Sequence, residues 1–389
     1  MVAAEYNNRM PRILHTSDLQ LGMTRRFFDV EAQARYTDDQ FAALRNLANI
    51  ADEKNCDAVV VAGDVFDSVQ PRRSIVSRAV EALNDFHVPV FLLPGNHDAD
   101  SPEAIWSTWD LPSRLPSQVV VLRDSAIHQL VHGRLEIVGA RWTSRRPDRD
   151  LVAEALAGLE PPARGTTRIL VGHGGIDAIN PDPSNQNLIR LDYVEDALSR
   201  GVIHYLALGD RHSALQVGET GRVWYSGAPI MTDFREDINS TNRALLVDID
   251  IDGYNVNPVI VGQWRFLREE LEMSGMDLLD SIKARLASEG DRSRTALRFA
   301  IKGTLNMAEQ AELDEMLDQA NDTFASVRLS EQHCDIALIV DDADLAKLAI
   351  GGYGDAAVAE LAELASGTPP DEDAVLALRT LYRLLEGSR

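Results

Sequence analysis

The chain has 389 residues, with 38 Lys and Arg against 61 Asp and Glu, so its formal charge is −23. Hydrophobic residues make up 45%, which suffices for a folded core and excludes a disordered acidic protein. This much negative charge argues against binding nucleic acid by bulk charge, because such binding needs Lys and Arg against the phosphates. A phosphate-bearing substrate would need local positive groups or metal ions.

The cysteines and the N-terminal segment indicate the compartment. Cys56 and Cys334 have neither zinc-finger nor disulfide-framework spacing, as expected of a protein in a reducing compartment. Residues 1–12 lack the apolar stretch of a signal peptide, and no run approaches the roughly 20 apolar residues that span a bilayer. We expect a cytoplasmic protein with no membrane attachment.

The first 210 residues alternate short apolar runs with amphipathic stretches, which predicts an α/β layered domain. Most runs are continuous rather than alternating, which favours strands buried on both faces. These runs lie at residues 12–14, 58–62, 90–93, 119–122, 169–171 and 205–208. Apolar residues at helical spacing predict helices around residues 41–50 and 76–83. Further strands within 223–261 are expected to complete the sheets of this domain.

A second unit is predicted from residue 262 onward. Strands are expected at 264–272, 297–301, 326–329 and 336–340, with helices at 276–286 and 307–317. This pattern predicts a small α+β module. The sequence Gly-Gly-Tyr-Gly at 351–354 is typical of a linker, and two short amphipathic helices follow it. We therefore divide the chain into a catalytic domain (1–261), an α+β domain (262–350) and a helical tail (351–389).

Polar residues follow five of the predicted strands, at the points where the strands end. They occur in Ser17-Asp18-Leu19-Gln20, Gly63-Asp64-Val65-Phe66-Asp67, Gly95-Asn96-His97-Asp98, Gly172-His173-Gly174 and Gly209-Asp210-Arg211-His212. Sheets of α/β proteins bind ligands at the carboxyl ends of their strands. One such motif is usually an ordinary turn, but five together favour a binding site. Oxygen and nitrogen donors without cysteine favour Mn²⁺, Mg²⁺ or Fe²⁺.

These motifs, in this order, resemble those of the calcineurin-like metallophosphoesterases. Within that superfamily, the segments 15–18, 207–209 and 225–229 resemble the SbcD-type DNA repair exonucleases. The resemblance covers residues 12–230, whereas the module after Gly262 resembles the capping domain of those nucleases only in layout. It implies a four-layered α/β/β/α catalytic domain, a small capping domain and a helical C-terminal tail.

The resemblance also implies a site for two divalent metal ions, with Mn²⁺ expected first. One ion would be held by Asp18, Gln20, Asp64 and His212. The other would be held by Asp64, Asn96, His173 and Asp210, so that Asp64 bridges the two. Two ions about 3.5–4 Å apart can stabilise both the attacking and the leaving oxygen of an in-line displacement at phosphorus.

Three further residues are expected near the metal ions. His97 resembles the catalytic histidine of the family, which contacts the phosphate and can help to protonate the leaving oxygen. Asp67 and Asp98 are expected to orient the loops or His97. The alternative for both carboxylates is ordinary turn capping.

Two positions depart from the family pattern, which has histidine where this chain has Gln20 and Asp210. A glutamine oxygen is a weak neutral ligand, and Asp210 replaces a neutral imidazole by an anion. Asp18, Asp64 and Asp210 carry three negative charges. Together with two divalent ions they give the site a formal charge of +1, one unit below the family pattern. We expect weaker metal retention and lower activity than in a typical member, with a preference for Mn²⁺ or Mg²⁺.

We predict a two-metal phosphodiesterase, most specifically a DNA exo- or endonuclease subunit that acts in DNA repair. The resemblance implies a partner, an SMC-like coiled-coil ATPase that binds the region past the cap, and a homodimer. The alternatives are a phosphodiesterase of small nucleotides or other phosphoesters, and a catalytically weak scaffold subunit of the ATPase complex. The acidic chain alone is expected to bind DNA weakly. Trp106, Trp109 and Trp142 either stack on bases or pack in the core.

Overall fold

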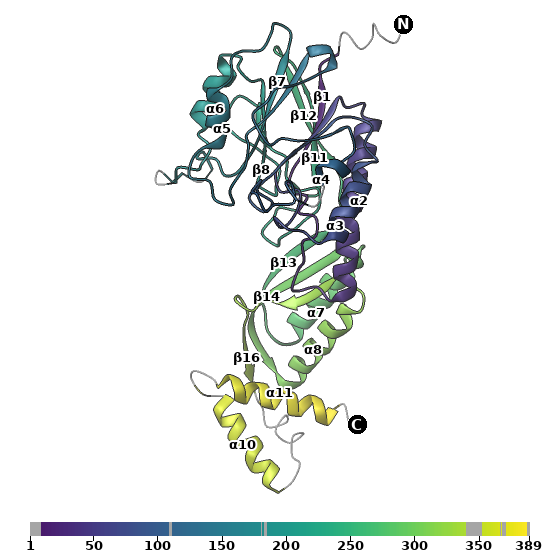
Figure 1. Cartoon of the computed structure of the whole chain (residues 1–389). Coiled ribbons are helices and arrows are strands. Elements are labelled where there is room, and N and C mark those ends of the chain that lie inside the picture. The colour runs from purple at the N-terminus through teal and green to yellow at the C-terminus, as the bar shows by residue number, and fades with distance from the viewer. Residues whose placement is uncertain are drawn as a thin grey trace. The chain divides into compact units, whose positions relative to one another are not determined.

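The computed structural model describes residues 9–108, 111–179, 181–182, 185–339, 352–365, 367 and 371–386. The chain forms two compact units (Figure 1). The first consists of Met1–Arg26 and Gln33–Trp264, and the second of Phe27–Ala32 and Arg265–Arg389. Trp109, one of the three tryptophans singled out above, lies outside the described residues.

The first unit contains two six-stranded sheets, and both are mixed. The first sheet has the order β12 (Tyr254–Ile260), β11 (Arg243–Ile249), β1 (Arg12–Thr16), β2 (Ala58–Ala62), β3 (Val90–Leu93), β4 (Val119–Val121). The second has the order β5 (His128–Leu130), β6 (Leu135–Gly139), β7 (Thr167–His173), β8 (Tyr205–Gly209), β10 (Val223–Tyr225), β9 (Leu215–Gln216). The strands β1 to β4 are parallel to one another, as are β6, β7, β8 and β10. The predicted α/β class is confirmed.

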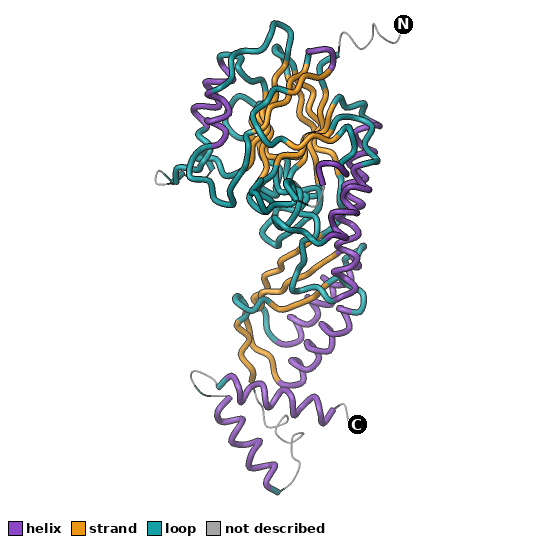
Figure 2. The backbone as a smooth tube through the Cα atoms, viewed as in Figure 1, coloured by secondary structure: helices purple, strands orange, loops and turns teal. Residues whose placement is uncertain are grey.

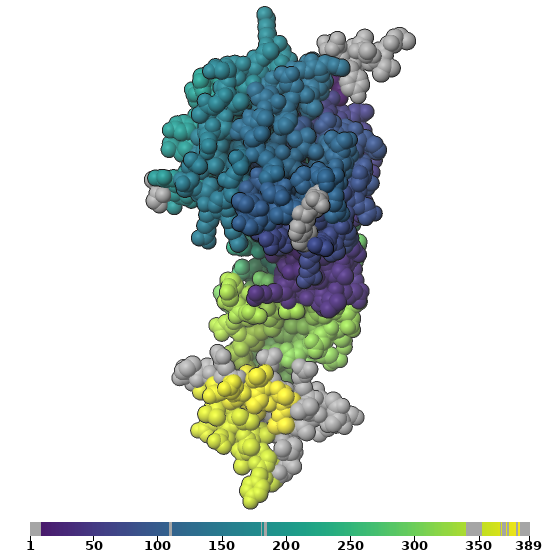
Figure 3. Space-filling model, in the orientation of Figure 1, coloured from purple at the N-terminus to yellow at the C-terminus, as the bar shows by residue number. Residues whose placement is uncertain are grey.

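Alternate residues of each central strand face opposite layers. Ile13 of β1 and Ile169 of β7 contribute to one buried cluster between the two sheets. Their neighbours Leu14 and Leu170 point the other way, into separate clusters with helices. Strands covered on both faces are mostly apolar, which explains the continuous runs in the sequence. Figure 2 shows these strands at the centre of the unit with the helices outside them, and Figure 3 shows the outer surface of the chain in the same orientation.

The helices of the first unit cover the outer faces of the two sheets. The first sheet is covered by α2 and α3, and the second by α5 and α6. The bounds are α2 (Val30–Glu53), α3 (Arg73–Leu83), α4 (Leu111–Arg114), η1 (Val131–Gly133), α5 (Leu151–Ala157) and α6 (Leu191–Ser199). The order of layers in this unit is therefore helix, sheet, sheet, helix.

All six strands predicted in the first 210 residues are present, but β5 and β6 were not predicted. β6 is buried along its whole length although it contains a charged residue, Glu136. The Glu136 carboxylate pairs with buried Arg168 on β7 at 2.7 Å. A buried charge is tolerated when a partner compensates it, and that partner lies 32 residues away in the sequence. Local patterning therefore could not identify this strand.

The second unit is built on a four-stranded sheet covered by helices. Its elements are β13 (Arg265–Glu272), α7 (Gly275–Ala287), η2 (Arg292–Arg294), β14 (Thr295–Asn306), α8 (Met307–Asn321), β15 (Ser326–Leu329), β16 (Asp335–Ile339), α10 (Tyr353–Ala365) and α11 (Glu372–Glu386). β14 pairs with β13, β15 and β16, and every pair is parallel. The predicted α+β module is therefore a βαβ arrangement, because the crossover helices α7 and α8 return the chain to the same end of the sheet.

The sequence did not indicate two features of the second unit. The short segment 27–32 belongs to it, since the rings of Phe27 and Phe28 pack edge-on against Phe266 with centroids 5.5 and 5.8 Å apart. The helices α10 and α11 also belong to it and share a buried cluster with Met307 at the start of α8. No helix in the described ranges has the length and apolarity that a membrane span requires.

The cluster between the two sheets should dominate the stability of the first unit. Ile169 is fully buried, whereas Ile260 on edge strand β12 is 70% exposed. We expect Ile169→Ala to lower the free energy of unfolding by about 2–5 kcal/mol. The variant loses the favourable free energy of transferring the deleted apolar atoms out of water, and it leaves a cavity. The matched control, Ile260→Ala, should cost less than about 1 kcal/mol. Urea unfolding followed by circular dichroism measures both, and equal midpoints would contradict the layer assignment.

Candidate metal centre

The loops after β1 and β2 run side by side at the carboxyl end of the first sheet. The amide of Asp18 donates to Gly63 O at 3.0 Å, and the amide of Gln20 donates to Asp64 O at 2.9 Å. These contacts require a left-handed backbone, with φ of 53° at Asp18, 42° at Gln20 and 53° at Asp64. Such φ values are unfavourable for residues other than glycine and are concentrated at functional sites.

The second sheet approaches this edge so closely that glycine is required. A Cβ on Gly63 would lie 2.0 Å from His173 Nδ1, and a Cβ on Gly209 would lie 1.9 Å from Ala62 O. The His173 ring, at the end of β7, therefore reaches the first sheet and donates from Nδ1 to Ala62 O at 2.8 Å. This bond leaves Nε2 as the nitrogen that can bind a metal.

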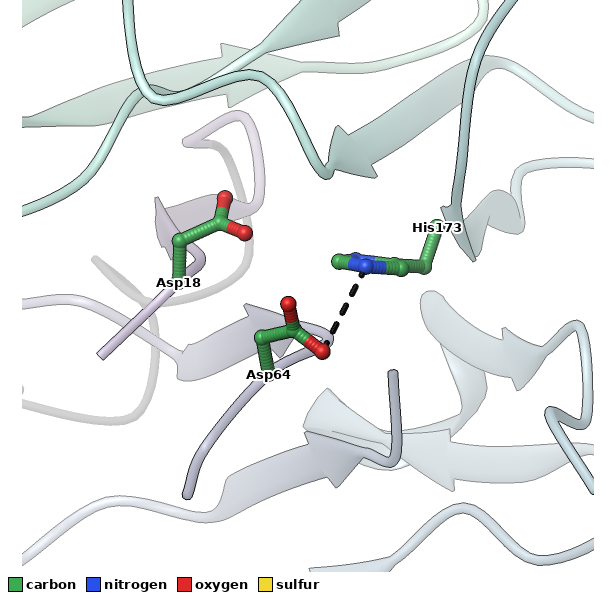
Figure 4. Close-up of side chains that lie close together, drawn as sticks. All are labelled: Asp18, Asp64 and His173. Carbon is green, nitrogen blue, oxygen red and sulfur yellow. Dashed lines mark ion pairs between the residues drawn. The ribbon is translucent and has the colours of Figure 1, made fainter. Parts of the chain in front are cut away.

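Asp18, Asp64 and His173 form a buried group whose ligand atoms lie within 4.8 Å of one another (Figure 4). Figure 4 shows the two carboxylates and the imidazole converging on one space from three strand ends, with the 3.6 Å ion pair between His173 Nε2 and Asp64 Oδ1 drawn as a dashed line. The three residues come from both sheets. The site therefore exists only when the two sheets are packed together.

Two more of the predicted ligands lie around His173 Nε2. Asn96 Oδ1 is 2.7 Å from that nitrogen, and Asp210 Oδ1 is 3.8 Å from it. Ligand atoms at right angles around an ion, each about 2.1 Å from it, are about 3 Å apart. The spacing of Asn96 and His173 thus suits joint coordination. The Asp210 side chain is 41% exposed, and its residue has a φ of 95°.

The remaining predicted ligands, Gln20 and His212, lie on the other side of Asp18. His212 Nε2 is 3.8 Å from Asp18 Oδ1, and Gln20 Nε2 is 3.2 Å from His212 Nε2. Gln20 Oε1 is buried and has no hydrogen-bond partner within the described part of the chain. An unpaired buried carbonyl oxygen is costly, and a bound cation would satisfy it.

The structure adds one carboxylate that sequence reasoning missed. Glu236 Oε1 lies 2.8 Å from His212 Nδ1, and the Thr232 hydroxyl is 2.7 Å from the same nitrogen. Thr232 also donates to Glu236, so the three side chains form one network. Carboxylates that bind the outer nitrogen of a ligating histidine set its tautomer and orientation. No spacing rule links Glu236 to His212, so the sequence held no usable signal for it.

His97 and Asp67 lie beside the group, and Asp98 lies beneath it. His97 is 31% exposed, with Nδ1 3.2 Å from Asp67 O and 3.4 Å from Asp67 Oδ1. The fully buried Asp98 carboxylate instead accepts from the amides of Gly95 at 2.7 Å and Phe66 at 3.0 Å. Asp67 therefore contacts His97, whereas Asp98 connects the loops after β2 and β3.

Asp18, His97 and His212 have pKa values outside their ordinary ranges. Burial raises the pKa of Asp18 to about 6. The Asp67 hydrogen bond raises the pKa of His97 to about 9. Burial opposes protonation of His212, but Glu236 and Asp18 outweigh it and raise that pKa to about 9. In the protein alone, histidine protons thus balance the buried carboxylates. Divalent ions would take over that role and displace the protons.

The donor set fits divalent metal ions. It combines carboxylate, amide and imidazole groups without thiolate, which suits Mn²⁺ and Mg²⁺ better than softer ions. Two further observations favour a bound cation, namely the unpaired Gln20 oxygen and the concentration of negative charge.

Comparison with known proteins agrees with this geometry. Residues 11–245, which contain all of these ligands, match the calcineurin-like phosphoesterase family. The chain belongs to that family. The predicted superfamily is therefore confirmed.

The relatives include proteins named for nuclease activity and DNA repair. The SbcD subunit of nuclease SbcCD from Rhodobacter capsulatus is 32% identical over 261 residues, 56% of this chain and 62% of that protein. Its namesake in Bacillus subtilis is 31% identical over 30% of this chain and 26% of that protein. DNA double-strand break repair protein Mre11 of Saccharolobus solfataricus is 25% identical over 44% of this chain and 43% of that protein. The chain thus matches only about a quarter to three fifths of the length of these relatives.

Two of the tryptophans singled out in the sequence pack against the candidate metal centre from within the core. Trp106 is buried and donates from Nε1 to Asp98 O at 2.6 Å. Trp142 is buried edge-on against the His173 ring, with centroids 5.2 Å apart. Both pack against site residues rather than presenting a face for base stacking.

The Glu236 network should control metal affinity through His212. We expect Glu236→Ala to weaken Mn²⁺ binding about 10- to 100-fold, because His212 loses the partner that orients it. Glu236→Gln keeps a hydrogen-bond acceptor for His212 and should therefore weaken Mn²⁺ binding less. Isothermal titration calorimetry of the metal-free protein measures both affinities. The exposed Glu219→Ala is the control, and unchanged binding in Glu236→Ala would exclude the network from the site.

Proposed function

We propose that this chain is a metal-dependent phosphodiesterase that cleaves DNA, acting as a nuclease subunit of the SbcD type. The observation that carries the proposal is the buried group of Asp18, Asp64 and His173 at the meeting point of two sheets in a phosphoesterase-family fold. The nuclease names of its relatives support DNA as the substrate.

We assign the ligands to two divalent ions, preferably Mn²⁺. Asp18, Gln20, Asp64 and His212 would hold one ion, and Asp64, Asn96, His173 and Asp210 the other. The contacts described above support this division, since Gln20 and Asp18 surround His212 Nε2 while Asn96, Asp64 and Asp210 surround His173 Nε2. When bound, such ions supply Lewis-acid stabilisation of phosphoryl oxygens and a water of lowered pKa.

His97 is the residue that we assign to the scissile phosphate. Asp67 engages its Nδ1, so Nε2 is the nitrogen available to a phosphate oxygen. The pKa of about 9 keeps the ring protonated in the protein alone, so that it can donate to the leaving oxygen. Asp67 thus orients and charges His97, while Asp98 holds the two loops that carry Asp64 and His97.

The second unit and the tail extend the proposal to partners. We assign the sheet unit after Trp264 to the capping domain and α10–α11 to the contact with an SMC-like coiled-coil ATPase. The tail helices bury one side on α8, yet Tyr353 is 97% exposed and Leu376 is also exposed. Amphipathic helices with apolar residues left exposed are typical of docking elements. A cytoplasmic homodimer that binds DNA weakly without its ATPase completes the proposal.

A catalytically weak scaffold is the second candidate, and Gln20 is the observation that favours it. Its side-chain amide nitrogen lies 3.2 Å from His212 Nε2, the atom that would otherwise face a metal. The first ion should therefore be held less tightly than the second.

Hydrolysis should depend on the bridging carboxylate and on His97. With Mn²⁺ titrated against single-stranded DNA, duplex ends and a small phosphodiester, Asp64→Asn should abolish turnover because both ions lose a ligand. His97→Ala should retain metal but lose about 10²- to 10⁴-fold in rate. The matched controls are Asp148→Asn and His87→Ala, which make the same changes at exposed side chains. If the protein turns over none of these substrates in a metal-dependent reaction, with or without the ATPase, the nuclease proposal is wrong and the scaffold function remains.

Restoring the family histidine should strengthen the first metal position. We expect Gln20→His to tighten Mn²⁺ binding about tenfold or more, because an imidazole replaces a weak amide ligand. Electron paramagnetic resonance of bound Mn²⁺ counts the ions at each concentration. An unchanged stoichiometry and affinity would show that Gln20 does not limit this position.

A further inference from the structure

One row across the sheet of the second unit consists entirely of arginine. Arg268 of β13 is the register partner of Arg298 on β14, which is in turn the partner of Arg328 on β15. Register partners in neighbouring parallel strands project their side chains on the same face, and neighbouring strands lie about 4.8 Å apart. Three guanidinium groups therefore start from Cα atoms within about 10 Å of one another.

The arginine row lies on the sheet face that α7 and α8 leave uncovered. Leu297, Phe299 and Ile301 of β14 pack with those helices in one buried cluster. Arg298 alternates with them along the strand and so points to the opposite face. Figure 1 shows α7 and α8 on one side of the strands.

Placing three like charges in one row is unfavourable for folding, since like charges directly opposite each other on adjacent strands repel. Arg268 pairs with Glu270 at 2.8 Å, and the Arg298 guanidinium lies 5.9 Å from the centre of the Phe27 ring. Arg328 is exposed and has no ion-pair partner among the residues that the structure describes. Four residues further along these two strands, the charge of Lys302 on β14 is neutralised by its register partner Glu272 on β13, at 3.1 Å.

The same face is hollowed next to the row. A cavity of about 340 Å³ is lined there by Arg268, Glu270, Glu272 and Lys302, together with the turn at Gln332–Asp335. Arg268 therefore borders a concave surface, whose lining also contains the carboxylates of Glu270, Glu272 and Asp335. In a chain with a charge of −23, three arginines in one row are a local concentration of positive charge.

We propose that the arginine row, Arg268–Arg298–Arg328, binds the phosphodiester backbone of a DNA strand. This inference rests on the proposed function, for which it supplies local positive charge in an acidic chain. Guanidinium groups bind phosphate oxygens through two parallel hydrogen bonds, which ammonium groups cannot do. A row about 10 Å long and parallel to the axis of a duplex spans about three phosphates, because each strand carries one phosphate per about 3.4 Å of axis.

The test compares the double variant Arg268→Gln/Arg328→Gln with Lys283→Gln/Arg200→Gln, which removes the same charge from exposed positions on α7 and directly after α6. Arg298 is left in place because its side chain is half-buried against Phe27. Fluorescence anisotropy with labelled single-stranded and duplex DNA in EDTA measures affinity between about 50 and 200 mM salt.

The double variant should bind DNA about tenfold or more weakly at low salt. Its slope of log affinity against log salt should fall by about 1.4 to 1.8, the value for two lost phosphate contacts. The control pair should keep the wild-type slope. Arg268→Lys/Arg328→Lys keeps the charge and should keep the slope while losing part of the affinity, which separates phosphate binding from a folding defect.

Three results would overturn the proposal. The first is wild-type affinity and slope in the double variant, and the second is no DNA binding by the wild-type chain at low salt. The third is loss of binding to a polyglutamate peptide with DNA binding intact, which would reassign the row to an acidic protein partner. Mn²⁺-dependent hydrolysis of a small phosphodiester by the wild-type chain reports the proposed activity separately, so failure of the row does not count against the metal centre.

Discussion

A hydrogen bond between the two sheets lies at the centre of the candidate metal site. His173 belongs to the second sheet and Ala62 to the first, and the bond from His173 Nδ1 to Ala62 O orients the imidazole toward the first sheet. It is possible only because Gly63 and Gly209 have no side chains at the contact. The close approach brings Asp64 within reach of His173 Nε2, and the remaining ligands are arranged around these two residues.

Buried negative charge is the consequence of this arrangement. Carboxylates taken out of water need compensation, which in the protein alone comes from histidine protons and from backbone amides such as those on Asp98. Divalent ions compensate the same charge more strongly. In the proposed two-metal site, Gln20 would be a weak neutral ligand and Asp210 would add one anion, so both residues would change this balance.

The second unit depends on a different constraint. Parallel strands joined by α7 and α8 bury one sheet face and leave the other open, and the register then aligns Arg268, Arg298 and Arg328. Each of these residues is 30 positions from the next in the chain, so nothing local connects them. Their alignment is a property of the sheet. A binding surface on this face and a metal centre in the first unit would divide substrate retention and chemistry between two parts of one chain.

The sequence by itself determined the α/β class, the six principal strands of the first 210 residues and the motifs that carry the metal ligands, because continuous apolar runs and polar strand ends are local patterns. It also pointed to the family that the match to residues 11–245 shows. Tertiary structure alone decided the rest. Glu136 lies in a buried strand because Arg168 neutralises it, Glu236 contacts His212 across 24 residues, and segment 27–32 joins the second unit through Phe266. Each of these depends on a partner that is distant in the chain, and pairing of that kind is set by packing rather than by local pattern.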